Sequence, residues 1–124
     1  MSSEENEKLV ILMTHGPCDA DASTLPVVMA NAALAMDVEA KLILQSDSVI
    51  IAQKGYPRHV HARGLAPLQE LLDSYFQQGG RLYVCTPCCE ARHIGKDDLV
   101  EQAEMVTAGF VIDECTSATN VLSY

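Results

Sequence analysis

Basic and large aromatic residues are scarce in this sequence. Eight Lys and Arg residues stand against 17 Asp and Glu residues, which gives a formal net charge of −9 at pH 7, and tryptophan is absent. Nucleic-acid binding requires a basic face, so a chain this acidic is not expected to have a nucleic-acid partner.

Long apolar runs are missing as well. No run approaches the roughly 20 residues that a membrane-spanning helix requires, so no membrane partner is expected. The first residues, Met1–Glu7, are polar and acidic, unlike a signal peptide, in which a charged start precedes an apolar stretch. We expect residues 1–7 to form a disordered tail and the protein to be cytoplasmic.

Two further absences restrict the chemistry. Neither G-x-x-x-x-G-K nor G-x-G-x-x-G occurs, so the sequence has no signature of a loop that binds nucleotide phosphates, and no cofactor is predicted. The five cysteines are an odd number, which in a reducing compartment does not predict a disulfide framework.

The 124 residues, 48% of them apolar, are enough for one globular domain, expected over residues 8–124. Alternating strand and helix patterns predict a three-layer α/β/α sandwich around a mainly parallel, five-stranded sheet. We expect the first helix to be capped by Ser23 or Thr24, and residues 53–64 to form a long loop. The predicted strands are residues 9–13, 39–45, 82–84, 104–107 and 120–124, and the predicted helices are 24–36, 46–52, 67–78, a helix beginning at 87, 99–102 and 110–118.

The most informative stretch follows the third predicted strand. Cys85 stands at the carboxyl end of that strand, and Cys88 and Cys89 lie in the first turn of the next helix, which Thr86 is expected to cap. Unpaired backbone N–H groups and the helix dipole lower the pKa of a thiol at such a position. Arg92 and His93 add positive charge one turn later. The pattern predicts a reactive-thiol site.

Other polar residues are expected near this site. Ligands bind at the carboxyl ends of strands in open α/β sheets, and there the segment from His15 to Cys18 and Asp47 should meet Cys85. Six of the eight Lys and Arg residues also lie between positions 54 and 96. This basic segment suits a small anion or an acidic partner, although a solvated loop at 54–64 explains it equally well.

Several segments together resemble one known family. These are Leu9–Pro17, Leu44–Asp47, Tyr83–Cys85 with Arg92–Ile94, and Asn120–Tyr124. In order and spacing they resemble the DsrE/DsrF-like proteins over nearly the whole chain.

The resemblance implies a cytoplasmic sulfurtransferase or sulfur carrier that forms a homotrimer or hexamer, with the trimer favoured. A cysteine at the position of Cys85 would take sulfane sulfur as a persulfide or thiosulfonate and exchange it with a TusA-like carrier protein. Thiosulfate or polysulfide would be the small donor, held by Arg92 and the helix-start amides, with His93, Thr86 and His15 nearby. Which of Cys85, Cys88 and Cys89 is primary stays open.

Three other interpretations stay open. Cys85-Thr-Pro-Cys88 is a C-x-x-C sequence, as in thiol-disulfide oxidoreductases, although no Trp and no proline after Pro87 are present. A metal site would draw on the three clustered thiols with His93 and on Cys18 or His15, but only one C-x-x-C pair exists. In a non-catalytic assembly protein the cysteines would be small core residues, the role expected here for Cys115.

Overall fold

The computed structural model describes residues 7–124 of the chain. The predicted acidic tail lies outside the described residues except for Glu7. None of the helices within this range has the length and apolar composition needed to cross a bilayer.

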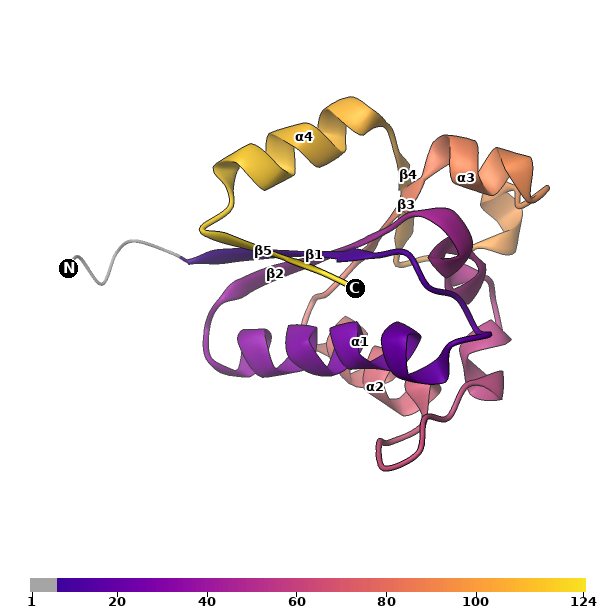
Figure 1. Cartoon of the computed structure of the whole chain (residues 1–124), viewed down its shortest axis with the longest axis horizontal. Coiled ribbons are helices and arrows are strands. Elements are labelled where there is room, and N and C mark those ends of the chain that lie inside the picture. Colours follow the sequence, from indigo (N-terminus) through magenta and orange to yellow (C-terminus); the bar gives the residue numbers. More distant parts are fainter. Residues whose placement is uncertain (1–6) are drawn as a thin grey trace.

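A five-stranded sheet forms the middle layer (Figure 1). Its strand order is β4-β3-β2-β1-β5, and each pair of neighbouring strands is parallel. The predicted five-stranded sheet is therefore confirmed, including the C-terminal strand, which forms one edge beside β1. The bounds are β1 (Lys8–Met13), β2 (Glu39–Leu44), β3 (Leu82–Cys85), β4 (Ala103–Val106) and β5 (Asn120–Ser123).

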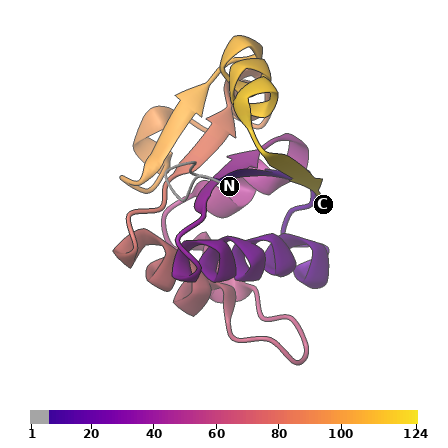
Figure 2. The same ribbon diagram turned by 90° about the vertical axis from the view of Figure 1, so that its left-hand side faces the viewer.

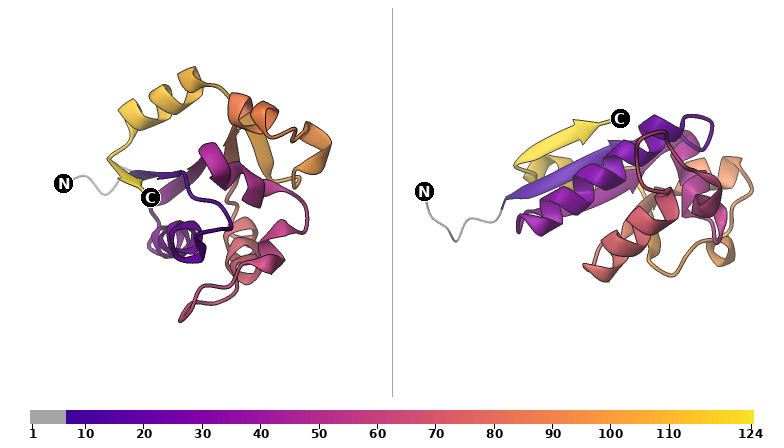
Figure 3. Two further views of the ribbon diagram at one scale, coloured as in Figure 1. Left: turned by 45° about the vertical axis from the view of Figure 1, so that its right-hand side comes forward. Right: turned by 90° about the horizontal axis from the view of Figure 1, so that it is seen from below.

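Helices cover both faces of the sheet, so the three-layer prediction is also confirmed (Figures 1 and 2). Helices α1 (Ala20–Ala35) and α2 (Leu68–Gln77) pack against one face. Helix α4 (Ala108–Ser117) lies over the other face, and α3 (Thr86–Ala91) follows β3 at the carboxyl end of the sheet (Figure 3).

The main core lies between the sheet and α1 and α2. Apolar side chains of alternate strand residues, such as Ile11, Leu42 and Val84, are fully buried there, as the period of two in a strand requires. Tyr75 of α2 is also fully buried, and its hydroxyl donates a hydrogen bond to the Arg81 carbonyl at 2.8 Å. Burial raises the pKa of this hydroxyl, so it stays a neutral donor.

On the opposite face of the sheet, α4 is held by a different kind of contact. Helix α4 has no buried residue, and its contact with the sheet includes an ion-pair cluster. The Glu114 carboxylate accepts from Lys8 Nζ at 2.7 Å and from Lys41 Nζ at 2.8 Å. The Lys41 ammonium also lies over the Tyr83 and Phe110 rings. Polar contacts thus position α4 on the sheet.

We expect Glu114→Gln to lower the free energy of unfolding by about 1–2 kcal/mol at pH 7, because two poorly exposed lysines lose their counter-charge. Burial alone would raise the pKa of Glu114, but the hydrogen bonds and charges of Lys41 and Lys8 lower it below its ordinary value of 4.5. The stabilisation is therefore present above pH 4.5 and lost as the pH falls through the folded-state pKa.

Denaturant unfolding of both proteins at several pH values measures this difference. The gap between wild type and Glu114→Gln should be widest at neutral pH and should close in acid. A gap that stays constant down to pH 3 would show that packing, not charge, fixes α4.

Some local predictions were wrong. Helix α1 begins earlier than predicted, because the Asp19 carboxylate, not Ser23 or Thr24, caps it by accepting from the Ala22 N–H at 3.0 Å. Pro26 lies inside this helix rather than in its first turn. The expected helix at 99–102 is instead a 3-10 turn at Lys96–Asp98, since Leu99 pairs with Gln53 in an isolated bridge. The predicted loop at 53–64 contains a 3-10 turn, Tyr56–His59.

Candidate thiol site at the carboxyl end of the sheet

Three strands end together at the site. In the register of the sheet, Met13 of β1 pairs with Leu44 of β2, and Leu44 pairs with Val84 of β3. The segments that follow therefore start side by side: the loop after β1, the 3-10 helix η1 (Ser46–Ala52) after β2, and Cys85 with α3 after β3. This shared edge brings the thiols of α3 next to η1.

Cys85 is the residue that caps α3. Its half-buried Sγ accepts a hydrogen bond from the Cys88 backbone N–H at 3.4 Å. The expectation that Thr86 would be the cap was wrong, because Thr86 is already helical and its hydroxyl donates to the Val106 carbonyl at 2.8 Å. A backbone N–H in the first turn of the helix thus points to a sulfur atom, an arrangement that favours a thiolate.

Cys88 has its own backbone donor. The N–H of Ser46 donates to Cys88 Sγ at 3.2 Å. Ser46 has a left-handed backbone with φ of 54°, a conformation that costs a non-glycine residue about 1–2 kcal/mol. Ser46, the second residue after β2, is therefore held in an unfavourable backbone conformation that directs its N–H to the Cys88 thiol.

Arg92 fastens η1 to α3. Its Nε and Nη2 donate to Asp47 Oδ1 at 3.0 and 2.8 Å, and its Nη1 donates to the Cys88 carbonyl at 3.1 Å. The loop after β1 also contacts η1 at Asp47. Gly16 of this loop lies so close that an added Cβ would be 2.5 Å from the Asp47 carbonyl oxygen. The guanidinium predicted to hold an anion is thus engaged with a carboxylate, and it keeps Ser46 and Cys88 together.

The prediction of a lowered thiol pKa was wrong for Cys85. Burial raises the pKa of Cys85 above its ordinary value of 9.0, and the hydrogen bond with the Cys88 thiol raises it further. The Cys88 N–H and the Arg92 charge act in the opposite direction and do not overcome these effects. Most of Cys85 is therefore a neutral thiol at pH 7.

Cys89 is a core residue. Its side chain has no exposed surface, and burial is the largest of the effects that raise its pKa to about 11. The prediction that Cys89 belongs to the reactive set is not supported by this environment, since a reactive thiol must be accessible to its donor. Helix α3 places residues 88 and 89 on different faces, one toward η1 and one toward the core.

The two histidines predicted near the site are exposed. His93 terminates α3 with a left-handed backbone, φ 57°, and its N–H donates to the Glu90 carbonyl. His15 lies in the loop after β1 with its Nδ1 3.4 Å from the Thr14 hydroxyl. Within residues 7–124, no hydrogen bond connects either imidazole to a thiol, and their substrate-binding roles stay predictions.

The remaining predicted features are the metal site, the two other cysteines and the basic segment. In the described part of the chain, no three His, Cys, Asp or Glu side chains gather in an arrangement that could hold a metal ion. Cys18 is exposed, and Cys115 is only half-buried on α4, so its expected core position was wrong. Lys54, Arg58 and His59 line a cavity of about 290 Å³, and the ion pairs found among residues 7–124 involve none of them.

Comparison with known proteins identifies the group to which the chain is related. Residues 7–124 match the DsrE/DsrF-like family. The chain belongs to the DsrE/DsrF-like family. The members of this family are in general sulfur-relay proteins, and the resemblance inferred from the short sequence segments is confirmed.

Individual relatives match this DsrE/DsrF-like protein in sequence or in fold. The uncharacterized protein MJ0989 of Methanocaldococcus jannaschii is 26% identical over 117 residues, which are 94% of this chain and 99% of that protein. The crystal structure of the ychN protein from E. coli superposes with a TM-score of 0.81 at 22% identity and covers 95% of this chain and 99% of its own. A protein of unknown function from Methanobacterium thermoautotrophicum has a TM-score of 0.72 at 15% identity, over 96% and 100% of the two chains.

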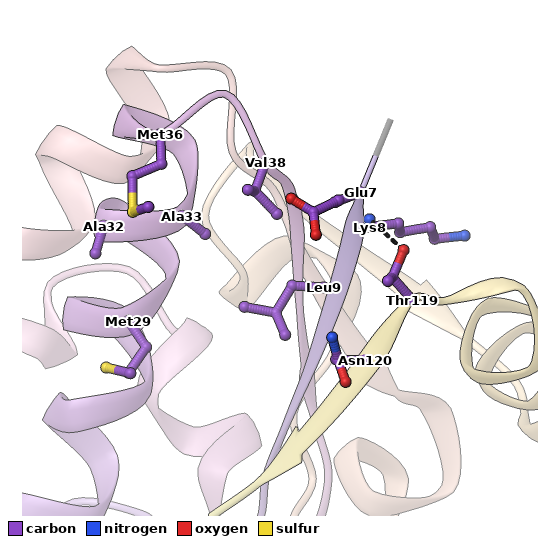
Figure 4. Close-up of a pocket in the computed structure, with 10 residues that line it drawn as sticks. All are labelled: Glu7, Lys8, Leu9, Met29, Ala32, Ala33, Met36, Val38, Thr119 and Asn120. Carbon is purple, nitrogen blue, oxygen red and sulfur yellow. Dashed lines mark hydrogen bonds between the residues drawn. The ribbon is translucent and has the colours of Figure 1, made fainter. Parts of the chain in front are cut away.

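An apolar cavity of about 280 Å³ lies at the other end of this DsrE/DsrF-like domain (Figure 4). Met29 of α1 and Met36, the C-cap residue of that helix, face Leu9 of β1 and Asn120 of β5 across it. Leu9 and Asn120 stand near the amino ends of their strands, whereas the thiols follow the carboxyl ends. The cavity is therefore separate from the thiol site.

Proposed function

We propose that this chain is a sulfurtransferase or sulfur carrier that takes sulfane sulfur on Cys85. The observation that carries the proposal is the position of this half-buried thiol at the end of β3, where it caps α3 and receives the Cys88 N–H at 3.4 Å. Membership of a family of sulfur-relay proteins supports the same chemistry.

The loading step is a displacement at sulfur. The Cys85 thiolate attacks the outer sulfur of a persulfide or polysulfide, the donor's sulfur–sulfur bond breaks, and the donor leaves as a thiolate or a shortened polysulfide. The proton that Cys85 releases passes to the leaving group or to water. The product is a Cys85 persulfide, and the sulfane sulfur keeps its oxidation state.

The Cys88 backbone N–H stabilises the negative charge on Cys85 Sγ. The Cys88 N–H points at Cys85 Sγ, so it stabilises the attacking thiolate, and the same donor is in place for this sulfur when it later leaves. Arg92 contributes its charge from the Asp47 ion pair without binding the donor directly. Because the raised pKa keeps most Cys85 neutral, loading should be slow at neutral pH and faster in base.

Mass spectrometry of the intact protein after incubation with polysulfide tests this function. We expect one added sulfur per chain, removable by a reducing agent, and a loading rate that rises with pH through the ordinary thiol range and beyond it. The rise continues beyond pH 9.0 because the pKa of Cys85 is raised above that value. The absence of any sulfur adduct, or a rate that does not change between pH 7 and pH 10, would contradict the proposal.

The discharge step requires a second protein. We propose that a TusA-like carrier accepts the sulfur through a thiolate that attacks the outer sulfur of the Cys85 persulfide, in the cytoplasm. The basic side chains around Lys54 and Arg58 suit an acidic partner. Transfer is measured as the appearance of the added sulfur on the carrier and its loss from this chain.

We also propose that the protein acts as a homo-oligomer, with a trimer favoured over a hexamer. Large apolar side chains that are exposed in the single chain support this, among them Met36 at 75% and Ile112 at 62% exposure. Native mass spectrometry should give three times the chain mass of 13.4 kDa.

A further inference from the structure

We infer that Cys88 is a second sulfur-holding thiol, and that the Ser46 backbone N–H is the group that enables it to receive sulfur from Cys85. The inference rests on the proposed function, since it concerns what happens to sulfur after Cys85 has been loaded. Its basis is the geometry around Cys88 Sγ.

The two thiols have matching environments. Cys85 Sγ receives the Cys88 N–H at 3.4 Å, and Cys88 Sγ receives the Ser46 N–H at 3.2 Å. Both side chains are half-buried, and the Cys88 thiol is close enough to contribute to the raised pKa of Cys85. Each sulfur can therefore act as attacking or leaving thiolate with one backbone donor in place, as reversible exchange between them requires.

The donor to Cys88 is held in place by several independent contacts. Ser46 adopts its left-handed conformation although it is not glycine, and such conformations persist only where the surroundings impose them. Here the Asp47–Arg92 ion pair and the bond from Arg92 to the Cys88 carbonyl fix η1 against α3. Gly16, in the loop after β1, packs directly on the Asp47 carbonyl. Three segments thus converge to aim one N–H at one sulfur.

The transfer step balances without a further reactant. The Cys88 thiolate attacks the outer sulfur of the Cys85 persulfide, a bond forms between Cys88 Sγ and the sulfane sulfur, and the bond from that sulfur to Cys85 Sγ breaks. Cys85 leaves as a thiolate and takes up the proton that Cys88 gave up. No oxidant or reductant is consumed, because the sulfane sulfur only changes its cysteine.

The matched donors predict the distribution of the sulfur. One N–H to each sulfur gives neither cysteine a large advantage, so at equilibrium the two should carry sulfur within about tenfold of each other. Cys88 would then be a second point from which a partner collects sulfur. Asp47 acts as a positioning residue for this exchange.

Peptide mapping tests the inference. The protein is loaded with less than one equivalent of polysulfide, alkylated with iodoacetamide at successive times and digested with trypsin, which releases residues 82–92 as one peptide. Fragmentation of that peptide locates the added sulfur. We expect it on Cys85 first and then on both Cys85 and Cys88. In Cys88→Ser the added sulfur should stay on Cys85 at all times.

Two variants examine the role of the Ser46 N–H. Asp47→Ala removes the acceptor of Arg92 and should lower the share of sulfur on Cys88 about tenfold, the value of one hydrogen bond, while total loading persists. Ser46→Gly keeps the N–H and accommodates the left-handed backbone, so it should leave the share unchanged. This partition between two cysteines would not respond to a loss of stability alone.

Sulfur confined to Cys85 at all times would overturn the inference and leave the proposed function intact. A Cys85–Cys88 disulfide with release of sulfide would also overturn it, because Cys88 would then attack the inner sulfur. A peptide without any added sulfur would overturn the proposed function and this inference together.

Discussion

Cys85→Ser should reduce sulfur loading from polysulfide by at least about a hundredfold, to the background of the assay. The serine hydroxyl stays protonated at any accessible pH and cannot form a persulfide. The fold should tolerate the change, because residue 85 caps α3 and serine is among the most favourable residues at that position. A melting temperature close to that of the wild type would therefore accompany the loss of loading.

Cys18→Ser is the matched control for this variant. Cys18 is exposed in the loop between β1 and α1 and, among residues 7–124, it is the exposed cysteine. The Cys18→Ser variant should load sulfur on Cys85 at the wild-type rate. Initial rates from intact-mass measurements at one pH compare the three proteins. If Cys85→Ser loads as fast as Cys18→Ser, the primary site is not Cys85, and a normal rate with the adduct on Cys88 would move it there.

The sheet and its order of elements could be predicted because the responsible signals are local. Apolar runs such as residues 9–13 and 82–84 are bounded by turn residues, and each became a parallel strand. The position of Cys85 followed from the same pattern, since a strand followed by Thr-Pro fixes where the helix begins to within one residue. The family resemblance rested on these ordered segments and was confirmed over residues 7–124.

The environment of the thiols could not be predicted, because it depends on residues distant in sequence. Cys88 and Cys89 are adjacent in sequence, yet one meets the Ser46 N–H and the other is buried in the core. Spacing alone cannot assign these faces for a helix of six residues. The raised pKa of Cys85 likewise comes from burial, whereas the sequence displayed only the helix start and the nearby positive charge.

The role of Ser46 and the close contact of Gly16 were not predicted, although the segment from His15 to Cys18 was expected at this edge. A serine gives no sign that its backbone is left-handed, a conformation more typical of glycine or asparagine. The contact that explains Gly16 is with the Asp47 carbonyl, 31 positions later in the chain. The prediction that Asp47 lies at the same edge was the available signal, and its ion pair with Arg92 makes this edge a connected site.

Gly16→Ala should damage both stability and sulfur distribution. The added Cβ would lie 2.5 Å from the Asp47 carbonyl oxygen and 3.0 Å from Asp47 Cβ. The Asp47 backbone cannot move aside as the end of a flexible side chain can. The loop after β1 and the helix η1 must therefore move apart. Overpacking of this kind costs about 1–3 kcal/mol. A shift of η1 also withdraws the Ser46 N–H from Cys88, so the Cys88 share of sulfur should fall about tenfold.

Gly109→Ala is the control, because a Cβ at this position in α4 has no neighbour within 4 Å. Alanine favours a helix by up to about 1 kcal/mol over glycine, so this variant should unfold at the same denaturant concentration as the wild type or a higher one. Its sulfur distribution should not change. Denaturant unfolding and the peptide map together separate the two effects. If Gly16→Ala unfolds like Gly109→Ala and loads Cys88 normally, the contact between the loop after β1 and Asp47 does not hold the site together.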